Sequence, residues 1–121
     1  MGSFERTREF QKRMKKYALD VINLYRKIPT SGEGKVIGNQ LLRSGTSVAA
    51  NYRSACRGRS KKEFIAKLGI SIEEADETIF WLEILRDSKT YTGNEITPLI
   101  EESDQILAIL NKTRYTAQKN M

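Results

Sequence analysis

The chain has 121 residues, 39% of them apolar and 30% charged, which suits a single domain with an ordinary core. Its net charge is +6, with no His, one Cys, and no apolar run near the roughly 20 residues that a membrane span needs. These features exclude an internal disulfide and a membrane span. With the charged residues that follow the start of the sequence closely, they predict a cytoplasmic protein without a signal peptide.

Two amphipathic helices are predicted in the first half of the chain. The first, at about 4–28, is indicated by apolar residues that recur every three or four positions: Phe10, Met14, Tyr17, Val21, Leu24 and Ile28. Pro29 and Gly32 follow it as stop signals. The second, at about 34–57, has a stripe of Ile37, Leu41, Ser44, Val48 and Ala55. We expect Gly58 to follow its end in a left-handed conformation.

Two more helices are predicted in the second half. The third, at about 60–88, starts with the capping box Ser60-x-x-Glu63, and its apolar face is Phe64, Leu68, Ile72, Ala75, Ile79 and Leu82. The fourth, at about 96–116, starts at Asn94 or at Thr97, and its core face is Leu99, Ser103, Leu107 and Leu110, widened by Ile96, Ile100, Ile106 and Ile109. No segment alternates with period two. The sequence therefore predicts an all-α, antiparallel up-down-up-down four-helix bundle, one domain over 1–121.

A run of small residues, 44–50, interrupts the apolar stripe of the second helix. Its simplest role is to let two helices pack closely. Asn51 ends the run, and we expect its side chain to hydrogen-bond across to the third helix, where the candidate partners are Glu74, Glu77 and Thr78.

The apolar stripes are wider than one core requires. The additional residues are Leu19, Ile22 and Tyr25 on the first helix, and Ile65, Phe80, Trp81 and Ile84 on the third. A few exposed apolar residues are normal. Adjacent helical positions cannot both point at one core, however, so Phe80 and Trp81 favour self-association. We predict an oligomer interface formed by Phe80, Trp81 and Ile84.

No catalytic grouping is recognisable in the sequence. Without His the chain lacks the usual general acid–base and the Glu-x-x-His pairs of di-metal bundles. The hydroxyls of Ser44, Thr46 and Ser47 have no base to activate them. Cys56 stands beside a basic residue, yet a lone cysteine near a helix end is more often a small apolar residue. We therefore predict no enzyme, no metal site and no cofactor.

Charge is divided unevenly along the chain. Residues 1–70 carry sixteen Lys and Arg against five acids, net +11, whereas residues 71–110 carry two against ten, net −8. The basic part favours nucleic-acid binding. The acidic part could instead face basic helices, within one subunit or across an interface.

Basic residues cluster on the first helix and around the turn between the second and third helices. In an antiparallel bundle both clusters lie at the same end of the molecule. The predicted nucleic-acid-binding residues are Lys12, Arg13, Lys15, Lys16, Arg53, Arg57, Arg59, Lys61 and Lys62. Two other interpretations stay open: an ordinary solubilising surface, and a docking site for an acidic protein partner.

Three segments carry a family resemblance: LRSGTSVAANYR at 42–53, KEFIAKL at 62–68 and EADETIFWLE at 74–83. Together they closely resemble the bacterial four-helix-bundle family of large-subunit rRNA intervening-sequence proteins. More distantly, they are similar to the accessory variability determinant proteins of diversity-generating retroelements. The resemblance implies a homopentamer, with RNA or DNA binding inferred from basic charge and gene context. The alternative is a protein-assembly adaptor.

One position departs from the family pattern. Relatives usually have an acid shortly after the asparagine, as in Asn-x-x-Glu-Ala, where this chain has Ser54. Any ion pair which that acid forms in relatives is absent here. Arg43 then needs another partner, and we expect it to be Glu74 or Glu77.

Overall fold

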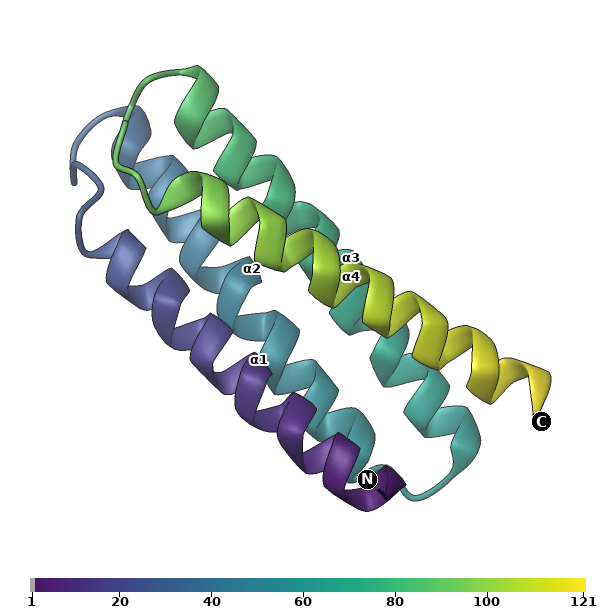
Figure 1. Ribbon diagram of the computed structural model, residues 1–121. Coiled ribbons are helices and arrows are strands. Elements are labelled where there is room, and N and C mark those ends of the chain that lie inside the picture. Colours follow the sequence, from purple (N-terminus) through teal and green to yellow (C-terminus); the bar gives the residue numbers. More distant parts are fainter. Residues whose placement is uncertain (1) are drawn as a thin grey trace.

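The chain forms four helices in a computed structural model, which describes residues 2–121. They are α1 (Ser3–Tyr25), α2 (Glu33–Cys56), α3 (Lys61–Asp87) and α4 (Ile96–Lys119). Figure 1 shows an antiparallel up-down-up-down bundle in which consecutive helices pack side by side, while α1 and α4 pack against each other less closely. The described residues contain no strand, so the predicted all-α four-helix bundle is confirmed.

The helix boundaries follow the predicted signals closely. Ser60 Oγ accepts a hydrogen bond from the backbone N–H of Glu63 at 3.1 Å, which confirms the N-terminal cap of α3. α1 ends at Tyr25, three residues before the predicted end, because the chain tightens there into turns that lead to Pro29. α4 starts at Ile96 and continues to Lys119, beyond the predicted 116.

The prediction for Gly58 was wrong. Within residues 2–121 the glycine with positive φ is Gly32, at φ 58°, just before α2. Gly58 instead donates its N–H to Ala55 O at 3.0 Å, in a tight turn at the end of α2. A left-handed residue is not needed where such a turn already occupies the last carbonyls of the helix.

The core runs along the bundle axis. The predicted stripes of α1 and α2 are buried, except that Phe10 is only partly buried and packs edge-on against Tyr52 at 4.9 Å between ring centroids. On α4, Leu99, Ser103, Ile106 and Leu110 are buried, with Ile96 at the start. Leu107, Ile100 and Ile109 are only partly buried.

The buried face of α3 is rotated from the predicted one. Phe64, Ile72 and Ile79 are only partly buried, whereas the structure buries Ile65, Leu68, Ser71, Ala75, Thr78, Leu82 and Leu85. Two of these are polar, and their hydroxyls are satisfied: Ser71 Oγ donates to Val48 O at 2.8 Å, and Thr78 Oγ1 donates to Glu74 O at 2.7 Å. Buried hydroxyls with such partners carry little desolvation cost.

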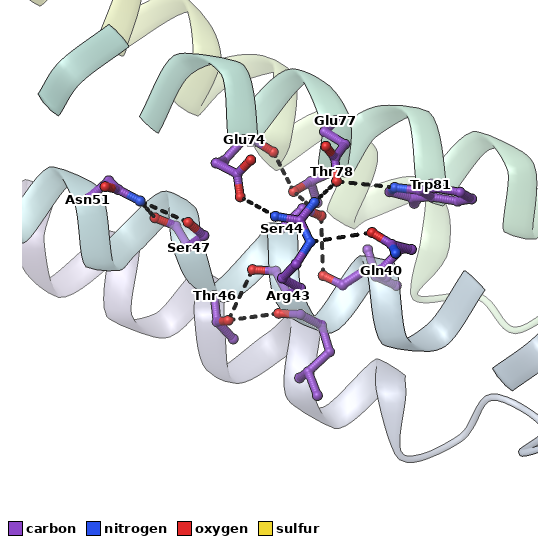
Figure 2. A network of polar contacts seen from close by, with 12 residues as sticks. Gln40, Arg43, Ser44, Thr46, Ser47, Asn51, Glu74, Glu77, Thr78 and Trp81 are labelled. Atoms are coloured by element: carbon purple, nitrogen blue, oxygen red, sulfur yellow. Dashed lines mark hydrogen bonds and ion pairs between the residues drawn. The ribbon is translucent and has the colours of Figure 1, made fainter. Parts of the chain in front are cut away.

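The small residues of α2 allow close helix packing, as predicted, and they do so on two sides. A Cβ added at Gly45 would lie 2.7 Å from Val21 Cγ1 of α1. On the α3 side, the hydroxyls of Thr78 and Ser44 are hydrogen-bonded at 3.0 Å. Asn51 does not behave as predicted, because its Nδ2 donates to Ser47 O and Ser47 Oγ, at 2.9 and 2.8 Å, within its own helix (Figure 2).

Across residues 2–121, no helix has a stretch both long and apolar enough to cross a membrane. In the same part of the chain, no three His, Cys, Asp or Glu side chains come close enough together to hold a metal ion.

Candidate nucleic-acid interface

A hollow of about 400 Å³ lies between α1 and α2, on the half of the bundle where α1 begins. Its basic lining residues are Arg8, Lys12 and Lys15 from α1, Arg53 from α2, and Arg57, the C-cap residue directly after α2. The uncharged lining residues are Gln11, Met14, Ala18, Ala49, Ala50 and Tyr52. No acid lines it. We call this hollow the basic groove.

Helical spacing explains how the groove is built. Arg8, Lys12 and Lys15 are four and three residues apart, so they share one face of α1, and Arg53 and Arg57 are likewise neighbours on α2. Ala18, Ala49 and Ala50 keep the space between the two rows of cations hollow because their side chains are short.

The cations of the groove are not neutralised by neighbouring acids. Within residues 2–121, Lys15, Arg53 and Arg57 form no ion pair in the structure. Lys12 lies 3.8 Å from Glu9, but both side chains are largely exposed, and such pairs contribute little. The Arg8 guanidinium lies over the Phe4 ring, 5.8 Å from its centroid. The positive potential of the groove is therefore available to a ligand.

Two predicted residues of α1 face another way. The Arg13 guanidinium donates to both carboxylate oxygens of Glu102 on α4, at 2.8 and 2.6 Å, and to Gln105. The hydrogen bonds to Glu102 raise the pKa of Arg13. Lys16 pairs with Asp20 at 2.8 Å. These two cations lie outside the basic groove, and Arg13 ties α1 to α4.

The three predicted residues of the α2–α3 turn lie at the same end of the bundle, as expected, but do not line the groove. Arg59 and Lys62 are exposed. Lys61 donates from Nζ to Asn120 O at 3.2 Å and borders a different hollow, next to Cys56 and Phe64. Conversely, Arg8 lines the groove and was missed by the sequence prediction. The sequence does contain a signal for Arg8: it lies four residues before Lys12, which places both side chains on one face of a helix.

A second polar arrangement joins α2 to α3 on another side of the bundle (Figure 2). Arg43 donates to Glu74 at 2.8 Å and also pairs with Glu77, and Gln40 lies beside it. The predicted partners of Arg43 are thus confirmed. Trp81 Nε1 donates to the same Glu77 at 3.3 Å. Part of the acidic charge of α3 is therefore neutralised by α2 within one subunit.

The residues predicted to form an oligomer interface are only partly accessible. Phe80 is 50% exposed, whereas Trp81 and Ile84 are partly buried and pack against the core. The Phe80 and Trp81 rings meet edge-on at 5.0 Å. Of the three predicted residues, Phe80 is the most exposed.

The fold and the groove define a class: a four-helix bundle with an unneutralised basic groove on one pair of helices. The chain belongs to the 23S rRNA-intervening sequence protein family, whose family model matches residues 6–112. A solved structure from Bacteroides thetaiotaomicron, a protein with unknown function from the S23 ribosomal protein family, is 34% identical to it. The match has a TM-score of 0.77 and covers 86% of this chain and 96% of that one. No curated protein matches the chain. The resemblance to the intervening-sequence protein family is thus confirmed.

Proposed function

We propose that this protein binds nucleic acid through the basic groove and catalyses no reaction. The observation that carries the proposal is the composition of the groove: five cationic side chains from two helices, with no acid among the lining residues. Arginine and lysine side chains held along a groove suit phosphate, because charge-assisted hydrogen bonds to phosphate oxygens are the strong ones.

The family supports RNA as the nucleic acid to test first, because it is named for the intervening sequences of 23S rRNA. The uncharged lining offers little for reading base edges. We therefore expect phosphate contacts that position the ligand, with weak sequence preference. Such binding weakens steeply with salt, since each neutralised phosphate lowers the slope of log affinity against log salt by about 0.9 on duplex DNA and about 0.7 on single strands.

The test is fluorescence anisotropy with a labelled rRNA hairpin at about 50 and 200 mM salt. We expect salt-sensitive binding that the double variant R53A/R57A weakens at least about tenfold. The matched control is R26A/K35A, which removes the same net charge from exposed positions that do not line the groove. Equal losses in both variants would show that net charge matters and the groove does not.

The same experiment bears on the alternative, a protein-assembly adaptor with an acidic partner. A wild type that binds neither RNA nor DNA at low salt would contradict nucleic-acid binding.

We also propose that the protein self-associates through Phe80, Trp81 and Ile84. Five subunits, as the resemblance implies, would place several basic grooves around one axis and increase avidity.

A further inference from the structure

One exposed aromatic side chain stands next to the basic groove. Phe4 is 71% exposed and lies one helical turn before Arg8, whose guanidinium is 5.8 Å from the ring centroid. Tyr52 also lines the groove, but it is 95% buried and its ring packs against Phe10. Phe4 is therefore the aromatic face beside the groove that a ligand can reach.

The shape of the groove limits what can enter it. The hollow between α1 and α2 has a volume of about 400 Å³, which is far smaller than one turn of a double helix. A duplex could touch the rims but could not descend to Ala18, Ala49 and Ala50. A single strand, whose backbone and bases can separate, could follow the groove.

The cations repeat along both sides of this space. Arg8 and Lys12 on α1 are four residues apart, as are Arg53 and the α2 C-cap Arg57, and four residues correspond to about 6 Å along a helix. That spacing resembles the distance between successive phosphates of an extended strand. Single-strand binding sites combine a positively charged groove with aromatic side chains on which bases stack.

We propose that the basic groove holds an unpaired strand of nucleic acid, and that a base at one end of it stacks on Phe4. This inference rests on the proposed function and narrows its ligand from nucleic acid in general to a single-stranded segment. Arg8 then has two roles, since it lines the groove and lies against the ring that receives the base.

The test compares labelled oligouridine and oligothymidine of about 12 nucleotides with an RNA duplex of the same length, all at one salt concentration. We expect the single strands to bind at least about tenfold more tightly than the duplex. F4A should weaken binding to the single strands about tenfold and leave duplex binding unchanged, because only a free base can stack. Circular dichroism checks that the variant stays helical.

The matched control is Y115A, which removes an exposed aromatic side chain from α4. Equal or tighter binding of the duplex would overturn the inference, as would an F4A variant that behaves like Y115A. Failure of the proposed function gives a different result: no salt-sensitive binding to any probe, or no effect of R53A/R57A.

Discussion

At the scale of single residues, two arginines of α2 illustrate two uses of the same side chain. Arg43 is paired with Glu74 and Glu77, and Glu74 is only 15% exposed. Arg53 faces the basic groove and has no ion pair with any residue in 2–121. One arginine therefore holds helices together, while the other is available to a ligand.

We expect R43A to lower the free energy of unfolding by about 1 kcal/mol, because it leaves the Glu74 carboxylate without its cation. The value is modest because Arg43 is half exposed. RNA affinity should stay within about twofold of wild type. R53A should show the reverse, with unchanged stability and weaker binding. Urea denaturation and anisotropy measure the two quantities, and an R43A variant that loses affinity as R53A does would contradict this division.

Tyr17 is the largest buried polar group of the core. Its hydroxyl is 2.5 Å from Ser103 Oγ, and Ser103 donates its own proton to Leu99 O, so Tyr17 is the donor. Burial raises the pKa of Tyr17 to about 12, although its hydrogen bonds lower the pKa by a smaller amount. Because folding raises this pKa, the contribution of Tyr17 to the stability of the fold is fully present below pH 10. It is lost as the pH rises from 10 through 12.

Wild type should therefore lose about 1.4 kcal/mol of stability from Tyr17 between pH 9 and pH 11. Y17F should be about 1 kcal/mol less stable than wild type at neutral pH, because it lacks the hydrogen bond to Ser103. Its stability should decline less steeply than that of wild type above pH 10. Burial also raises the pKa of Tyr52, so the stability of both wild type and Y17F still falls with pH in this range. Thermal melts across this pH range measure the difference, and parallel curves would contradict the assignment.

At the scale of the elements, the sequence predicted the helices better than it predicted which face of α3 is buried. Apolar residues surround α3, so periodicity does not single out one stripe. The deciding residues, Ser71 and Thr78, are polar, and their backbone partners cannot be seen in a sequence. The site shows the same limit: Arg13 looked equivalent to Lys12, but its partner Glu102 lies 89 residues further along the chain.

The packing of α1 against α2 depends on Gly45. Alanine there would place its Cβ 2.7 and 2.8 Å from the two methyl groups of Val21. Overpacking costs about 1–3 kcal/mol, which exceeds the roughly 1 kcal/mol that alanine gains over glycine in a helix. We therefore expect G45A to destabilise the protein by about 1 kcal/mol in urea denaturation.

A matched control exists on α3. The Cβ of G69A would meet the end of the Arg114 side chain at 3.3 Å, which can move aside, so this variant should be neutral or slightly more stable. Combining G45A with V21A should recover part of the loss due to G45A in a double-mutant cycle. Additive losses would mean that the close approach to Val21 is not the cause.

At the scale of the whole molecule, opposite charges gather on different helices. α1 and the end of α2 carry the basic groove, while α3 and the start of α4 carry most of the acids. Some of those acids form ion pairs within the subunit, with Arg43, Arg13, Arg86 and Lys27. The remaining separation suits a protein that presents its basic side to a polyanion and keeps acids away from it.

The last prediction concerns assembly. Phe80 is half exposed beside Trp81, so a charge placed there would have to be desolvated in an interface between copies of this chain that covers it. F80D should therefore yield a smaller species that is still helical, as judged by light scattering and circular dichroism. L19D is the control, because Leu19 is equally exposed on α1 and lies outside the predicted interface. A monomeric wild type, or F80D and L19D proteins of the same mass as wild type, would show that Phe80 has no part in assembly.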